Sequence, residues 1–243
     1  MENNNPDYVY QNVIQLDDAD ASRKFIANVF LWMFVALGIS AFCAWLFAND
    51  QSLVQLLYNP VTGGNTGLGT IVMFAPLAFI LVISFGFNRL SYSILTLLFI
   101  AYAAVMGISL SYILLAFTAG SVMGVFITSA LVFGVMAIAG YTTHQDLTKF
   151  GSIMIMLLIG IVIASLVNLL LHSTGLDMLI SYVGVAVFVG LTAYDVQKLK
   201  RIGAGIEYGD ASAKKMALMG GLTLYLDFVN LFLMLLRVFG RRR

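Results

Sequence analysis

Residues 217–239 read ALMGGLTLYLDFVNLFLMLLRVF, an apolar stretch with one acid, Asp227, and one base, Arg237. A helix needs about 20 apolar residues to cross the hydrocarbon core of a bilayer. Lipid offers the backbone no hydrogen-bond partners, so a crossing segment must satisfy its own polar groups, as a helix does. The stretch therefore predicts a transmembrane helix that carries a carboxylate well inside it.

The composition extends this interpretation to the whole chain. Of its 243 residues, 60% are hydrophobic and only 10% are charged, and the mean hydropathy is +0.94. A soluble domain carries about 25% charged residues. The net charge of +1 argues against a nucleic-acid partner. The single cysteine, Cys43, excludes a disulfide framework and a thiolate metal cluster.

The sequence predicts an all-α, polytopic membrane protein with seven transmembrane helices. The apolar runs are too long for barrel strands and do not alternate strictly. Residues 1–22 are polar and acidic and are expected to form a flexible cytoplasmic tail, and residues 23–243 to form the transmembrane domain. The expected spans are 25–47, 69–87, 91–117, 122–141, 152–171, 178–197 and 217–239.

Basic residues alternate between the loops. Arg89 follows the second span, Lys149 the fourth, and several lysines and Arg201 the sixth, whereas the loops after the first, third and fifth spans hold none. The positive-inside rule then places the basic loops and the N-terminus in the cytoplasm. Residues 241–243 are arginines, so the last span either crosses or re-enters; the whole set of loops favours crossing. Residues 49–68 are expected to be a plain, turn-rich external loop.

Two carboxylates interrupt the spans, Asp195 and Asp227. Such a residue near mid-bilayer costs about 2.5–3.5 kcal/mol and usually marks an ion path or a proton relay. Two structural alternatives stay open. Asp195 lies near the end of its span and can be an interfacial residue, and Asp227 can be a hydrogen-bonding partner of a neighbouring helix.

A polar stripe runs along the last span at spacings of three and four residues, which places its members on one helical face. This face is expected to point into the bundle and to line a pore, or else to form a helix-packing seam. The stripe consists of Gly220, Thr223, Asp227, Asn230, Met234 and Arg237.

Counted from the loop that joins their spans, Asp227 lies about 9 Å of helical rise deeper than Asp195. Helix tilt or a later helix start would bring them together. Two carboxylates at one site do not both ionise cheaply, so such a pair would hold a proton at low pH and bind calcium at higher pH. Arg89, Lys198 or Arg201 can pair with the ionised form. Arg89 is the preferred latch, with a positive-inside anchor as its alternative.

No enzyme activity is expected. His144 and His172 lie near opposite membrane faces, so they cannot share a metal. The chain has no nucleophile-elbow or zinc-protease motif. Asp195 and Asp227 are not followed by the glycine that intramembrane aspartyl proteases use. Calcium is expected only as a transported ion.

Three motifs carry a family resemblance. They are TAYDVQKLK at 192–200, LYLDFVNLFLMLLR at 224–237 and MGISL at 106–110. The chain resembles the Bax inhibitor-1 family, the transmembrane Bax inhibitor motif proteins, including bacterial YccA-like members.

The resemblance implies a last helix at the centre of two three-helix layers. It also implies a pH-sensitive calcium leak across the cytoplasmic membrane, with Asp195 and Asp227 as the sensor pair and an arginine latch after the second span, for which Arg89 is the candidate. YccA-like members also resemble regulators of a membrane AAA protease, which would make the acidic tail a partner-binding element.

Overall fold

The computed structural model describes residues 6–59, 63–205 and 211–243. Within these residues, seven helices are long and apolar enough to cross a membrane, as predicted. Most of them extend beyond the expected boundaries by several residues, because helices continue past the hydrocarbon core. The seven are α1 Pro6–Asn49, α3 Gly67–Gly86, α4 Tyr92–Ala116, α5 Ala119–Thr142, α6 Thr148–Leu171, α7 Thr174–Ala204 and α8 Ala211–Phe239.

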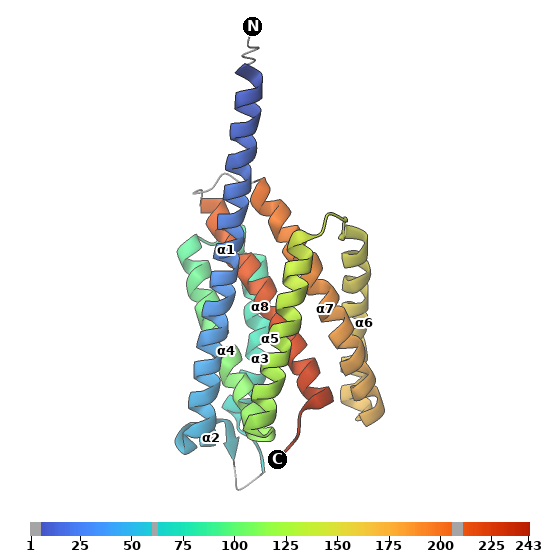
Figure 1. Ribbon diagram of the computed structural model, residues 1–243. Helices are drawn as coiled ribbons and strands as arrows, with labels where there is room; N and C mark the ends of the chain where they lie inside the picture. Colours follow the sequence, from blue (N-terminus) through green and yellow to red (C-terminus); the bar gives the residue numbers. More distant parts are fainter. Residues whose placement is uncertain (1–5, 60–62, 206–210) are drawn as a thin grey trace.

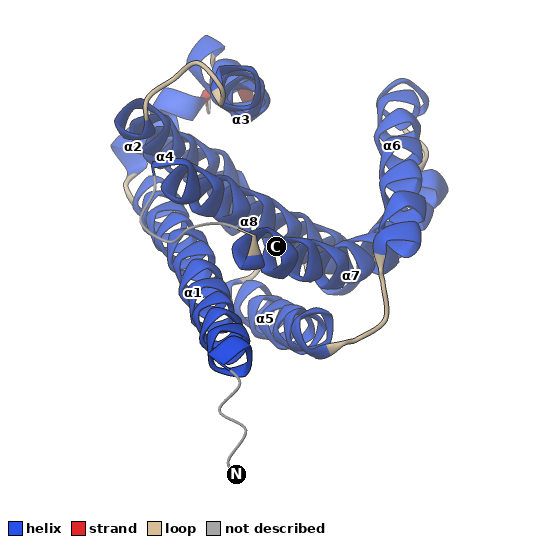
Figure 2. Ribbon diagram, turned by 90° about the horizontal axis from the view of Figure 1, so that it is seen from above, coloured by secondary structure: helices blue, strands red, loops and turns tan. Residues whose placement is uncertain are grey.

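The last helix, α8, lies at the centre of the bundle (Figure 2). It packs against α1, α4, α5 and α7. In its most apolar stretch 56% of the residues are buried, against 6% for α6, which packs mainly on α7 at the edge. The helix α3 lies at the opposite edge and packs mainly on α4. The expectation of a central last helix is therefore confirmed.

The start of α1 and the end of α8 lie at opposite ends of the bundle (Figure 1). The last helix runs the full length of the bundle, so it crosses rather than re-enters. The terminal arginines pack against the α4–α5 turn, where Thr118 N donates to Arg241 O and Arg243 N to Ala116 O, both at 3.0 Å. We call the other end, which carries Arg89, Lys198 and Lys215, the basic end.

The segment between α1 and α3 is more ordered than the sequence predicted. It holds a short helix, α2 Gln51–Leu57, and a two-stranded antiparallel pair, β1 Tyr58–Asn59 and β2 Gly64–Asn65. Asp50 caps α2 by accepting a hydrogen bond of 2.8 Å from Ser52 N. The expectation of a plain loop missed this cap, which satisfies otherwise unpaired N–H groups at the helix start.

The first span continues upstream as one helix from Pro6 and projects beyond the bundle at the basic end (Figure 1). The sequence predicted a flexible tail over residues 1–22, of which 1–5 lie outside the described residues. The flexibility of this segment stays a prediction.

Close helix approach depends on glycine at two places. A Cβ atom on Gly107 of α4 would collide with the backbone of Ser40 of α1, and one on Gly140 of α5 would collide with the backbone of Ala193 of α7. These contacts hold the α1–α4 and α5–α7 pairs at short distance, so that α8 is enclosed between them.

Candidate functional site: a buried pair of carboxyl groups

Two glycines mark close contacts between α7 and α8. A Cβ atom on Gly220 of α8 would lie 2.7 Å from Leu199 Cδ2 of α7, and one on Gly184 of α7 would lie 2.8 Å from Met234 Sδ of α8. Between these two points of close contact, the antiparallel helices bring Asp195 opposite Asp227. The difference of about 9 Å in helical rise between Asp195 and Asp227, counted from the connecting loop, therefore does not keep the two residues apart.

The carboxyl groups of Asp195 and Asp227 lie close enough to interact directly with one another. An ionised carboxylate only accepts hydrogen bonds, so a hydrogen bond between the two groups would need a proton on one of them. Asp227 is buried, with 6% of its surface exposed, and its Oδ2 atom has no hydrogen-bond partner among the described residues. The two residues thus form a pair of neighbouring carboxyl groups inside an apolar bundle.

A small cavity reaches this pair from the basic end. It has a volume of about 150 Å³ and is lined by Asp195, Lys198 and Thr223, among others, but not by Asp227. A water molecule occupies about 30 Å³, so the cavity has room for a few. Asp195 is therefore the member of the pair that water or a cation would meet first, with Asp227 behind it. Lys198, one helical turn further, interacts electrostatically with Asp195.

Aromatic side chains fill the bundle on the far side of the pair. The Phe228 ring, next to Asp227, lies 5.4 Å from that of Phe126 and 5.6 Å from that of Phe133, between centroids. The Phe126 ring also lies 6.0 Å from that of Phe232. A second cavity, of about 490 Å³ and lined partly by Leu235, lies further toward the C-terminal end of α8. These four rings, the aromatic cluster, lie between the two cavities along α8.

The predicted latch is not formed in this structure. Arg89 is exposed, and across the described ranges it makes no ion pair with either aspartate. The same corner is held to α8 by another cation, because Lys215 Nζ donates a hydrogen bond of 2.6 Å to Leu90 O. The sequence did not single out Lys215, since its partner is a main-chain carbonyl.

The polar stripe of α8 is only partly internal. Thr223 lines the small cavity and donates to Met219 O, and Asn230 is half-buried. Arg237 is exposed and pairs with Asp177 at 3.2 Å, because its long side chain reaches the bundle surface. The prediction that the stripe faces inward along its whole length is therefore wrong at Arg237. The opposite face, including Tyr225, is also buried because α8 is central.

The pair supplies few ligands for a resident metal ion. Within the described part of the chain, no group of three or more His, Cys, Asp or Glu side chains comes together. Calcium takes six to eight oxygen ligands. Two carboxyl groups supply at most four oxygen atoms, fewer than a resident calcium ion takes. The two histidines lie at opposite ends of α6. His144 is in the loop before this helix, and His172 is its left-handed C-cap.

The α5–α6 loop is held to α7 by Gln197, which the sequence analysis did not single out, and by Arg201, which it named only as a possible partner of the aspartates. Gln197 Nε2 donates to Gln145 O at 2.7 Å, and Gln197 Oε1 accepts from Leu147 N at 2.9 Å. Arg201 forms an ion pair of 2.8 Å with Asp146. The sequence offered one signal for this contact, the position of Gln197 near the end of an apolar span. A buried side-chain amide there requires hydrogen-bond partners from a neighbouring segment.

Comparison with known proteins gives consistent matches over the membrane region. The family model described as "Inhibitor of apoptosis-promoting Bax1" matches residues 22–243. The chain is 47% identical to the inner membrane protein YbhL of Escherichia coli K12, over 91% of this chain and 93% of that protein. It is 41% identical to a protein of Rickettsia prowazekii over 91% of each chain. It is also 34% identical to a membrane protein of Streptococcus pyogenes, over 90% of this chain and 93% of that one.

Proposed function

Because this chain belongs to the Bax inhibitor-1 family, we propose that it is a pH-sensitive calcium leak channel of the inner membrane. Asp195 and Asp227 are the groups that bind the proton and the passing cation in this proposal. The function requires no enzymatic step and no bound cofactor, and calcium is the transported ion.

The observation that supports the proposal best is the direct contact of two carboxyl groups inside an apolar bundle. A pair that carries a proton on each group has no charge with which to attract a divalent cation. When both protons are lost, two negative charges lie in contact and repel one another unless a cation enters between them. Proton binding and cation binding therefore compete at the same oxygens.

The surroundings of the pair support a closed state. The small cavity gives access from the basic end, and the aromatic cluster around Phe228 blocks the way toward the C-terminal end. Passage of an ion requires Phe228 and its neighbours to move. Under the positive-inside rule the basic end faces the cytoplasm, so the cavity would be open to the cytoplasm.

The test is calcium flux in proteoliposomes loaded with a calcium-sensitive dye, measured from pH 5 to pH 8. The wild-type flux is expected to fall as the pH is lowered, since protons displace the cation. Asp227→Asn and Asp195→Asn should each flatten the pH profile. Asp177→Asn is the matched control, because Asp177 lies on α7 in an exposed pair with Arg237, away from the cavity. A profile that stays unchanged in both pair variants would exclude the sensor role.

A second candidate function rests on the helical extension of α1. Residues from Pro6 continue the first helix beyond the bundle at the basic end, where a partner protein can reach them (Figure 1). This extension suits a regulator that binds a membrane AAA protease. Deleting residues 1–20 should then abolish co-purification with the protease and leave calcium flux unchanged. Retained co-purification would remove this candidate.

A further inference from the structure

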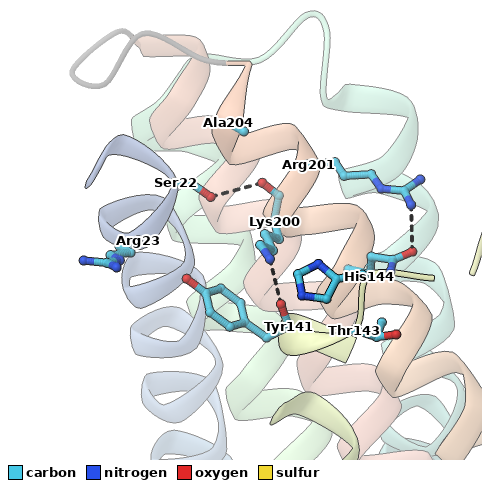
Figure 3. Close-up of a pocket in the computed structure, with 9 residues that line it drawn as sticks. Ser22, Arg23, Tyr141, Thr143, His144, Lys200, Arg201 and Ala204 are labelled. Atoms are coloured by element: carbon cyan, nitrogen blue, oxygen red, sulfur yellow. Dashed lines mark hydrogen bonds between the residues drawn. The ribbon is translucent and has the colours of Figure 1, made fainter. Parts of the chain in front are cut away.

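A cavity of about 600 Å³ opens at the basic end of the bundle (Figure 3). It lies between the start of the first span, the end of α5 and the last turns of α7. Three cationic side chains line it, Arg23, Lys200 and Arg201, together with His144. No acidic residue is among the described residues that line it. The cavity has the size of a ligand pocket, 300–1,000 Å³ as a rough range, and a positive lining.

Lys200 is held in place at this cavity. Its Nζ atom donates a hydrogen bond of 2.8 Å to Tyr141 O and lies 4.8 Å from the centroid of the Tyr141 ring. An ammonium group has three donors, and the described residues accept from one of them. Lys200 therefore presents a positioned cation with donors to spare.

The walls of the cavity are tied to one another. Ser22 Oγ of α1 donates to Lys200 O of α7 at 3.1 Å (Figure 3). Arg201 holds the α5–α6 loop through its ion pair with Asp146. Arg201 is thereby largely committed to the loop. The positively charged wall around Lys200 is carried by residues at helix ends, which are already fixed in place. Binding of an anion therefore requires little additional ordering of these side chains.

The cavity lies at the level where two membrane-spanning helices end. The first span begins at Ala21, and α5 ends at Thr142, so the cavity lies where two spans meet the headgroup region. Below Tyr141, the same side of α5 carries exposed apolar side chains at spacings of three and four residues. They are Ile138, Val135 and Leu131. A lipid whose headgroup occupied the cavity would have an apolar surface for its chains.

We propose that this cavity binds the phosphate group of one anionic phospholipid in the leaflet at the basic end. The phosphate accepts hydrogen bonds from Lys200, with Arg23 and His144 as further lining groups. Basic pockets between membrane helices bind anionic headgroups in this way. The proposal does not depend on calcium transport, because none of these residues lines the cavity at Asp195.

The test uses the purified full chain in a neutral detergent, with added phosphatidylglycerol or phosphatidylcholine. Native mass spectrometry measures the lipid retained, and thermal unfolding measures stabilisation. The wild type should retain one phosphatidylglycerol in preference to phosphatidylcholine. Lys200→Gln should lower that retention about fivefold, and Lys200→Arg should preserve most of it. Lys214→Gln is the matched control, since Lys214 is an exposed lysine of the same end outside the cavity.

A second variant, His144→Ala, leaves the Lys200–Tyr141 contact intact and should also lower retention, because the His144 ring lies beside Lys200 in the cavity (Figure 3). A folding defect of Lys200→Gln would then not decide the result. Equal retention by wild type, Lys200→Gln and His144→Ala would overturn the proposal. Inorganic phosphate is added in a separate arm without lipid. If phosphate alone gave the same Lys200-dependent stabilisation, the ligand would be a soluble anion and the lipid assignment would be overturned.

Discussion

Lys215 at the start of α8 donates a hydrogen bond of 2.6 Å from Nζ to the carbonyl oxygen of Leu90. Leu90 belongs to the corner between α3 and α4, and Phe87 of that corner lines the cavity that contains Asp195. The contact therefore holds the corner over the entrance to the carboxyl pair. The sequence analysis expected Arg89 to act as a latch at this corner. The cation that is bonded there is Lys215, and its partner is a main-chain carbonyl in place of a carboxylate.

Lys215→Met is expected to raise calcium flux at a fixed pH. A hydrogen bond from a charged group contributes about 1.5–3 kcal/mol, so its loss should favour the open corner about tenfold or more. Proteoliposome flux at pH 7 measures the effect. Lys214→Met, at the exposed neighbouring position, should behave as wild type. If both variants behave alike, the Lys215 contact does not restrict access.

The buried hydrogen bond between Ser40 and Tyr225 predicts an order of stabilities. Ser40 Oγ donates to Ala103 O and lies 2.7 Å from Tyr225 Oη, so Tyr225 donates to Ser40. Ser40→Ala leaves the buried Tyr225 hydroxyl unpaired and should cost about 1–3 kcal/mol. Tyr225→Phe removes the hydroxyl itself and should cost less. Thermal unfolding in detergent measures both, and the reverse order would contradict the assigned donor.

The pH dependence of the α5–α6 loop follows from Asp146. The Thr148 hydroxyl and N–H and the Arg201 guanidinium donate to its carboxylate and lower the pKa of Asp146 to about 2. Because the pKa of Asp146 is lower in the folded protein than its ordinary value of 3.8, the ionised carboxylate stabilises the folded loop at pH values above 3.8. This stabilisation is lost as the pH falls toward 2. Asp146→Asn should therefore mimic low pH at pH 6.

Hydrogen exchange of the backbone amides at 143–150, corrected for the intrinsic pH dependence of exchange, measures this effect. The wild-type loop should stay protected down to about pH 4 and lose protection below it. Asp146→Asn should exchange faster at pH 6, and Asp177→Asn, at the other end of the bundle, should leave these amides unchanged. Equal protection of the Asp146→Asn loop at pH 6 would show that Asp146 does not hold it.

Two glycines of α5 predict opposite effects of the same substitution. Gly140→Ala should destabilise the protein by about 1–3 kcal/mol, because the new methyl group meets the Ala193 backbone. Gly134→Ala should stabilise it by about 0.5–1 kcal/mol, because Gly134 has no atom within 4 Å of a built Cβ and alanine favours the helix. Thermal unfolding of the two variants in one detergent compares them. A stabilising Gly140→Ala would contradict the close α5–α7 approach.

The candidate site was only partly predictable from the sequence. Asp195 and Asp227 stood out because ionisable residues are rare in apolar spans. Their contact did not follow from the helical rise, since it depends on how α7 and α8 pack against one another, with close contacts at Gly184 and Gly220. Lys215 was missed because a lysine near a membrane surface has an ordinary explanation, and its partner is a backbone atom.

The sequence alone determined the number of spans, their alternating direction and the identity of the two unusual aspartates. The reason is that insertion of a segment into a bilayer depends on its own length and polarity, which are local properties of the sequence. The contact between the two carboxyl groups and the cation that lies next to their cavity were decided only in the tertiary structure, and the central place of the last helix was expected only from the family resemblance. Those relationships depend on how closely helices far apart in the chain approach one another, and that distance is set by glycine contacts and packed side chains on both partners.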